Sequence, residues 1–198
     1  SAFLLNRSSD LDLIILEGMD ELIYHEIGAA LKGATGQLPA ANRVSAASFD
    51  EAAFDQLVMI AASYGEPVIY CTKEFAVKMI PQEAWRYTEA MKDELYRKGM
   101  LAGYKGNKVV ILEQGFTDET HAEKLIDPGF CWIIPNNAGT KPVKVALEGG
   151  VLVEEWKNHD WSREVQVYQK VGVVCMMSND ICVYVDESLA GQMNTWNL

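Results

Sequence analysis

Histidine is the side chain that most often serves as a general base or a metal ligand near neutral pH, and this chain has three. They are His25, His121 and His159, and none has a second histidine four residues away or a cysteine close by. Asp160 follows His159 and could orient its imidazole, but no serine or cysteine nucleophile stands beside the pair. Residues 118–123 around His121 are rich in carboxylates, yet consecutive side chains do not converge on one ion. We predict a surface ion pair for His25, solvated polar segments for the other two, and no metal site.

The four cysteines are Cys71, Cys131, Cys175 and Cys182. No two of them have the Cys-x-x-Cys spacing of a redox or zinc motif, and four cysteines in 198 residues are too few for a disulfide scaffold. We predict that they are buried, reduced thiols that behave as small apolar side chains.

Gly99, Gly103 and Gly106 are spaced closely enough to suggest a phosphate-binding loop, and Lys105 lies among them. They fit neither GxGxxG nor GxxxxGK[ST], and they follow a predicted helix instead of joining a strand to a helix. The sequence also lacks the GxSxG elbow, and its 28 carboxylates do not single out a catalytic pair. We predict turn glycines, no catalytic residue, no cofactor and no metal. The protein is therefore not expected to be an enzyme.

The composition gives 17 basic against 28 acidic residues and a net charge of -11. Such a chain is a poor general nucleic-acid binder, because neutralising phosphates requires clustered lysine and arginine. An acidic balance also disfavours anionic membranes, and no apolar run approaches the roughly 18 residues of a membrane span. The 49% hydrophobic and 23% charged fractions are typical of a globular protein.

Helices are expected to dominate the first half of the chain. Apolar residues recur at a period near 3.6 from Leu11 to Leu31, with a capping box at Ser9 and a stop at Gly33. A loop is predicted from Gly33 to Ala47. The remaining predictions for this half are a helix capped at Ser48 and ending at Gly65, a strand 68–71, a helix 74–80 capped by Thr72, and a helix from Pro81 to Gly99.

Strands are expected to dominate the second half. A turn is predicted at 104–107 and one or two helical turns within 118–126. The predicted strands are 130–134, 142–147, 151–156 and a long one from Arg163 to Met177, in which apolar residues alternate along one face. Residues 181–185 are predicted to be its antiparallel partner. Helices followed by strands indicate an α+β fold.

The five tryptophans are candidates for core or interface anchors. Trp156 and Trp161 flank a short turn before the long strand, which makes them the better interface candidates.

The order and local pattern of residues 11–186 resemble a tailed-phage major capsid protein with the coat fold of Hong Kong phage 97. Ser48 to Cys71 is similar to that family's helix-then-strand step into its axial domain. Residues 103–112 are similar to the family's glycine turn and the strand after it, and residues 142–149 to a late strand of the same domain. Residues 160–173 with 181–184 are similar to its long peripheral hairpin.

The resemblance implies a spine helix and a long C-terminal β-hairpin in a peripheral domain, residues 1–33 and 156–198. A compact axial domain would cover 34–155. The resemblance implies no catalytic residue. The family's N-terminal arm and extended loop are not found in this chain, which begins with Ser1, so we expect a truncated coat protein with further residues upstream.

The implied function is a structural subunit that self-assembles through pentamers and hexamers into the icosahedral head shell of a tailed phage or prophage. Its partners would be copies of itself, portal and scaffold proteins, and DNA enclosed without sequence-specific binding. It would be located in the virion, after assembly in the bacterial cytoplasm. A cellular nanocompartment shell of the same fold, or a small-molecule-binding or enzymatic α+β domain, remains an alternative. The candidate subunit-interface residues are Glu17, Asp20, Glu21, Tyr104, Lys105, Asn107, Trp156, Trp161 and Arg163.

Overall fold

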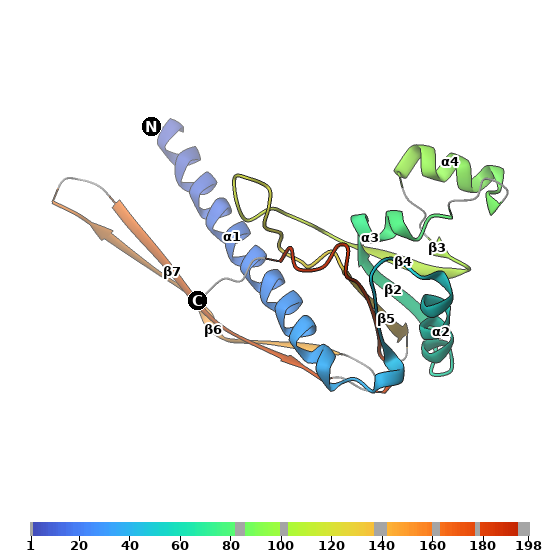
Figure 1. Ribbon diagram of the computed structural model, residues 1–198. Coiled ribbons are helices and arrows are strands. Elements are labelled where there is room, and N and C mark those ends of the chain that lie inside the picture. The colour runs from blue at the N-terminus through green and yellow to red at the C-terminus, as the bar shows by residue number, and fades with distance from the viewer. Residues whose placement is uncertain are drawn as a thin grey trace.

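The fold is a six-stranded mixed sheet covered by helices on both faces, from which a long helix and a two-stranded ribbon extend (Figure 1). The computed structural model describes residues 2–81, 86–99, 103–136, 142–159, 163–176 and 179–193, and the side chains of these residues apart from 2–17 and 163–165. Helices and strands are both abundant, so the predicted α+β class is confirmed.

Helix α1 runs from Ala2 to Ala34, 33 residues, or about 50 Å at 1.5 Å per residue. The predicted helix from Leu11 to Leu31 is therefore present, but Ser9 is not its cap. The chain before Ser9 contains alanine and two leucines, which are good helix formers, and the helix continues through them.

The sheet has the strand order β1-β8-β5-β2-β4-β3. Pairs β1/β8 and β2/β4 are parallel, and the other three pairs are antiparallel. The strands are β1 (Arg43–Ala46), β2 (Glu66–Thr72), β3 (Gly103–Tyr104), β4 (Asn107–Leu112), β5 (Phe130–Asn136) and β8 (Cys182–Asp186). Strand β1 lies within the predicted loop 33–47.

One face of the sheet is covered by α2 (Glu51–Ala62) and α3 (Lys73–Lys78). Helix α2 begins at Asp50, whose carboxylate accepts the backbone N–H groups of Ala52 and Ala53, so the predicted cap at Ser48 is two residues early. Thr72 caps α3 as predicted. The core on this face consists mainly of Phe54, Leu57, Ala61, Ile69, Cys71, Phe75, Cys131, Ile133, Cys182 and Tyr184.

The other face is covered by the end of α1 and the short segment that follows it. Leu38 packs there against Trp132, Ile181 and Val183, with Leu31 at the margin. Lys32 of α1 also reaches the buried carboxylate of Asp127, with Nζ 2.6 Å from Oδ2. Apolar packing and an ion pair therefore join the long helix to the sheet.

Helix α4 spans Glu89–Lys98 and ends, as predicted, at Gly99, which has a left-handed φ of 69°. Its start is not Pro81. Thr88 has extended backbone angles and accepts the N–H of Met91, so it separates the helix from the chain before it. The predicted helical turns in 118–126 are also absent. Asp118 instead accepts the N–H groups of Ala122 and Glu123 in a non-helical turn.

The ribbon consists of β6 (Val143–Lys157) and β7 (Arg163–Cys175), which pair with each other. The two predicted strands 142–147 and 151–156 are one strand, interrupted by a bulge between Glu148 and Leu152 at Gly149, which has φ 77°. The predicted pairing of the long strand with 181–185 is wrong, because that segment forms β8 inside the six-stranded sheet. A long hairpin is present, but it forms with the preceding strand. It extends away from the sheet in the direction of α1 (Figure 1), and α1 contacts β7.

Candidate subunit-contact sites

The first candidate site is the turn between β3 and β4. Tyr104 pairs with Asn107, which leaves Lys105 and Gly106 as a two-residue turn with positive φ values of 47° and 88°. Two positive values define a type I′ turn, the twist of which suits an antiparallel hairpin. Asn107 Nδ2 donates to the Tyr104 carbonyl oxygen over 3.2 Å and fixes the turn.

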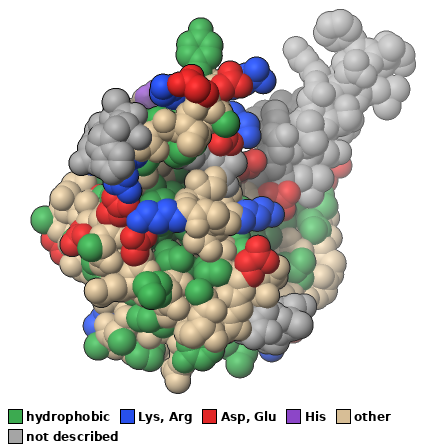
Figure 2. All heavy atoms as spheres, turned by 90° about the vertical axis from the view of Figure 1, so that its right-hand side faces the viewer, with side chains coloured by type: hydrophobic (Ala, Val, Ile, Leu, Met, Phe, Trp, Pro, Cys, Tyr) green, Lys and Arg blue, Asp and Glu red, His purple; other side chains and the backbone are tan. Residues whose placement is uncertain are grey.

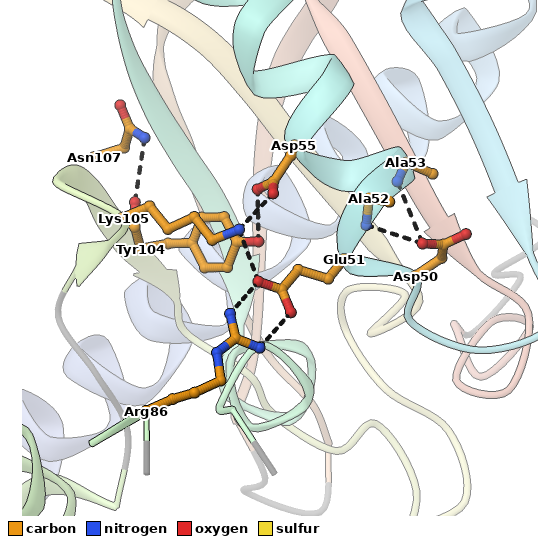
Figure 3. A network of polar contacts seen from close by, with 9 residues as sticks. All are labelled: Asp50, Glu51, Ala52, Ala53, Asp55, Arg86, Tyr104, Lys105 and Asn107. Carbon is orange, nitrogen blue, oxygen red and sulfur yellow. Dashed lines mark hydrogen bonds and ion pairs between the residues drawn. The ribbon is translucent and has the colours of Figure 1, made fainter. Parts of the chain in front are cut away.

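A polar network holds this turn against the start of α2 (Figure 3). The Tyr104 hydroxyl donates to Asp55 Oδ1 over 2.8 Å, and Lys105 Nζ contacts Asp55 Oδ2 and lies 2.7 Å from Glu51 Oε1. Arg86 binds Glu51 with both guanidinium nitrogens, Nη1 to Oε2 over 2.7 Å. Glu51 thus joins two cations that come from separate parts of the chain.

These contacts change the protonation of their members. Hydrogen bonds from Arg86 and then Lys105 lower the pKa of Glu51 to about 2. Burial, and then the hydrogen bond to Asp55, raises the pKa of Tyr104 above its ordinary value of 10.0. Both shifts favour the charge states that the network needs, so the network is a stabilising contact between α2 and the turn.

A surface groove of about 420 Å³ lies beside the network. Its charged lining includes Glu51, Arg86 and Lys105, and its apolar lining includes Met79 and Met91. Figure 2 shows this side of the molecule, where acidic and basic side chains lie next to each other above a largely uncharged area. The two predicted residues Tyr104 and Lys105 therefore border a groove, but Tyr104 itself is buried.

The second candidate site is on α1. Asp20 and Glu21 line a groove of about 360 Å³ together with Glu113. Between them Tyr24 donates its hydroxyl hydrogen to the Glu113 carbonyl oxygen over 3.0 Å. The predicted residues Asp20 and Glu21 thus lie together at an acidic groove. The side chain of Glu17 is outside the described part of the chain.

The third candidate site is the far end of the ribbon. Trp156 lies on β6 opposite Glu164 and is 44% exposed, a large apolar side chain in solvent. Arg163 begins β7 opposite Lys157, and only its backbone is described. Trp161 is outside the described residues. The described members of the three candidate sites lie on different elements, namely the turn between β3 and β4, helix α1 and strand β6.

The sequence reading missed a larger feature, the exposed apolar surface of the ribbon. Leu152 and Val153 are 66% and 62% exposed. Other exposed apolar side chains on the two strands and directly after them are Val145, Leu147, Val151, Trp156, Tyr168, Val174 and Met176. The alternating valines of β7 and the run Val143-x-Val145-x-Leu147 were the sequence signals for it.

The strand register divides these exposed apolar side chains between the two faces of the ribbon, with Leu152 and Tyr168 opposite each other on one face and Val145, Leu147 and Val153 on the other. Opposite residues on paired strands share a face. The pairs Val143/Cys175, Val145/Val173, Leu147/Val171 and Val153/Val167 therefore form a single apolar strip, called here the ribbon strip. On β7 these residues are half-buried, whereas Val145, Leu147 and Val153 on β6 are exposed. The β6 side of the ribbon strip is thus the uncovered side.

Among the described residues, no group of three His, Cys, Asp or Glu side chains could hold a metal ion. His25 is 2% exposed, so the predicted surface location is wrong. Its Nδ1 lies 3.8 Å from Oε1 of Glu26, the neighbouring residue on α1. Of the cysteines, Cys71, Cys131 and Cys182 are buried as predicted, and Cys175 on the ribbon is only half-buried.

Comparison with known proteins assigns the chain to a family. A family model for capsid proteins matches residues 14–185, most of the chain, so this is a capsid-type protein. The family is described as "SPbeta prophage-derived putative capsid protein YonB", and the chain belongs to this YonB family. No match was found among curated proteins. None of the helices in the described residues is long and apolar enough to cross a membrane.

Two solved structures resemble the chain at low identity. A virus-like particle from Pyrococcus furiosus is 14% identical with a TM-score of 0.45, over 82% of this chain and 62% of that one. The holo-SrpI encapsulin complex from Synechococcus elongatus PCC 7942 is 11% identical with a TM-score of 0.46, over 93% and 67%. This chain spans less than two thirds of the Pyrococcus furiosus chain.

Proposed function

We propose that the chain is the major capsid protein of a tailed phage or prophage, which self-assembles into an icosahedral head shell around DNA. The observation that carries the proposal is the ribbon strip in a member of a capsid family. Soluble monomers rarely expose a large contiguous apolar patch, and such patches mark interaction surfaces. A specific interface of standard size buries about 1,600 Å², which requires an extended surface of this kind.

The two parts of the fold suggest how a subunit would be arranged in a shell. In the proposal, α1 and the ribbon form the peripheral part and the six-stranded sheet forms the axial part. The sheet has its apolar faces covered within the chain, so it supplies a rigid body. Among the described residues neither ribbon strand pairs with a third strand, and the β6 side of the ribbon strip is exposed, so in the proposal the ribbon supplies the contacts between copies. Closed rings of such heterologous contacts form pentamers and hexamers.

The net charge of -11 agrees with enclosing DNA without binding it tightly. A basic inner surface would hold duplex through counterion release, whereas packaged DNA must enter and leave. We therefore propose that the chain contributes no sequence-specific DNA contact. Portal and scaffold proteins, the virion as location and assembly in the bacterial cytoplasm belong to the same proposal.

Assembly tests the proposal directly. The full gene product, expressed with its neighbouring phage genes, should form closed shells in electron microscopy and elute as particles in size exclusion. The double substitution Leu147→Ser with Val153→Ser should abolish particles while the subunit keeps its circular dichroism spectrum. Lys144→Ser is the matched control, because Lys144 is exposed on the same strand but points to the other face, and it should still assemble.

Two outcomes would contradict the proposal. If the full gene product stays monomeric with its neighbouring genes present, it is not a shell subunit. If the double substitution assembles as well as Lys144→Ser does, the ribbon strip is not the contact. The content of purified particles then separates a phage head, which holds DNA, from a nanocompartment, which holds a protein cargo.

A further inference from the structure

Two of the buried cysteines occupy facing positions in the centre of the sheet. Strands β2 and β5 are antiparallel, with Ile69 opposite Ile133 and Tyr70 opposite Trp132. The next position along both strands puts Cys71 opposite Cys131, and both residues lie within the two strands. Opposite residues share a face of the sheet, and both cysteines belong to the core under α2 and α3.

The distance between facing positions suits a disulfide. Cα atoms of opposite residues on antiparallel strands are about 4.5–5.5 Å apart. Disulfides join Cα atoms about 4.4–6.8 Å apart. Burial, and then a hydrogen bond with the Cys71 thiol, raises the pKa of the Cys131 thiol, as expected for two thiols in contact.

We propose that Cys71 and Cys131 form a dithiol that closes to a cross-strand disulfide when the protein meets a small disulfide oxidant such as glutathione disulfide. One cysteine thiolate attacks a glutathione sulfur and releases glutathione thiolate, which leaves a mixed disulfide. The thiolate of the second cysteine then attacks the first cysteine's sulfur and releases the second glutathione. Overall the two cysteines lose two electrons, which reduce one glutathione disulfide to two glutathione thiols, and these take up the two cysteine protons.

Burial decides when this reaction occurs. Both thiols are fully buried, so the first step needs a local opening of the sheet, and the folded protein reacts slowly. Once the mixed disulfide forms, the strand register holds the second thiol beside it. That arrangement makes the second step effectively intramolecular and the disulfide hard to reduce. The cytosol keeps such pairs reduced, whereas the extracellular medium oxidises them.

The pairing does not rest on the proposed function, and it concerns a different part of the molecule from the ribbon strip. If the chain is a shell subunit, the disulfide would form after particles leave the cell. A closed disulfide crosslinks a long stretch of chain and reduces the entropy of the unfolded state. In a protein of this size that corresponds to a Tm higher by roughly 5–15 °C.

The test incubates the reduced full-length protein with glutathione disulfide a few degrees below its Tm, followed by alkylation and non-reducing peptide mapping. The expected result is one linked peptide pair that contains Cys71 and Cys131, a mass lower by two hydrogens, and the higher Tm, all reversed by dithiothreitol. The variants Cys71→Ala and Cys131→Ala should lose the linkage and the Tm shift. The control Cys175→Ala should keep both, since Cys175 is on the ribbon.

Three outcomes would overturn the inference. The first is a peptide map that shows only alkylated Cys71 and Cys131. The incubation must be at a temperature at which hydrogen exchange shows that the amides of the sheet open to solvent. The second is a disulfide that joins either of them to Cys182 instead. The third is linkage of Cys71 to Cys131 without a rise in Tm, which would mean that the bond strains the sheet. Peptide mapping of the wild-type protein decides the case even if the alanine variants fold poorly.

Discussion

The six-stranded sheet and the two-stranded ribbon are built from similar residues but differ in how they are covered. Strand β8 is buried along nearly its whole length, because α2 covers one face and the end of α1 covers the other. Strand β6 is exposed along nearly its whole length. Valine and leucine therefore stabilise the monomer in the sheet, whereas in the ribbon they leave apolar area for another molecule. Substitutions in the two regions should separate folding from assembly.

The largest effect on folding is expected for Phe54→Ala. Phe54 is fully buried and lies within ring-contact distance of Phe49, Phe75, Tyr104 and Tyr184. Truncation removes apolar burial and leaves a cavity, so the free energy of unfolding should fall by about 3–5 kcal/mol. Urea denaturation measures it, with Tyr96→Ala at an exposed site as the control. A loss below about 1 kcal/mol would mean that the sheet is not the stable body.

The next largest effect is expected for Gly129→Ala, just before β5. A Cβ atom at this position would lie 2.6 Å from the backbone N and Cα of Ala190, so the C-terminal turn must move. We expect a loss of about 1–3 kcal/mol, as for other overpacked sites. Gly33→Ala, where a Cβ would meet nothing within 4 Å, is the matched control and should not destabilise. Equal thermal stability of the two variants would contradict the close approach.

A smaller, pH-dependent effect is expected for Glu51→Gln. The folded-state pKa of Glu51 is lowered from 4.5 to about 2, so its stabilising contribution is present above about pH 4.5 and lost as the pH falls toward 2. Glu51 is partly exposed, so solvent screening limits the contribution to about 0.5–1 kcal/mol at pH 7. Unfolding of both proteins between pH 7 and pH 2 should show a difference that shrinks with acidity. A difference that grows with acidity would contradict the ion pairs with Arg86 and Lys105.

The smallest effect on folding is expected for Leu152→Ser on the ribbon. Leu152 is 66% exposed, so its removal should change the free energy of unfolding by less than about 0.5 kcal/mol. Thermal unfolding of the isolated subunit at low concentration is the measurement, with Leu57→Ser in the core as the contrasting variant. A large loss for Leu152→Ser would show that the ribbon is covered within the monomer and would weaken the proposed contact.

Local signals predicted the elements with strong caps and turns. Thr72, Gly99 and the turn at Lys105 and Gly106 were read correctly, because each depends on one or two neighbouring residues. The start of α2 was placed at Ser48 instead of Asp50, since both residue types cap helices and the sequence does not say which one turns.

Strand pairing could not be predicted in the same way, because it depends on what covers a strand. The turn-forming residues 178–180, Ser-Asn-Asp, favour pairing of 181–185 with the long strand that precedes them. The segment 181–185 is a continuous apolar run, which needs cover on both faces and so belongs in the sheet. In residues 143–157, lysine and glutamate interrupt the apolar residues, so this segment tolerates exposure to solvent. The candidate residues Tyr104 and Lys105 were found from their turn, whereas the ribbon strip required the cross-strand register.

The position of β8 has a consequence for synthesis of the chain. Strand β8 lies between β1 and β5, and Arg43 of β1 is opposite Val183, a separation of 183 − 43 = 140 residues. While the ribosome is still producing the ribbon, β1 has no partner and one edge of β5 is open. Pairing across such a separation is slow, because a large loop must close first. The ribbon strip therefore leaves the ribosome before β8 has been made. A nascent chain thus exposes the proposed contact surface before the six-stranded sheet has folded.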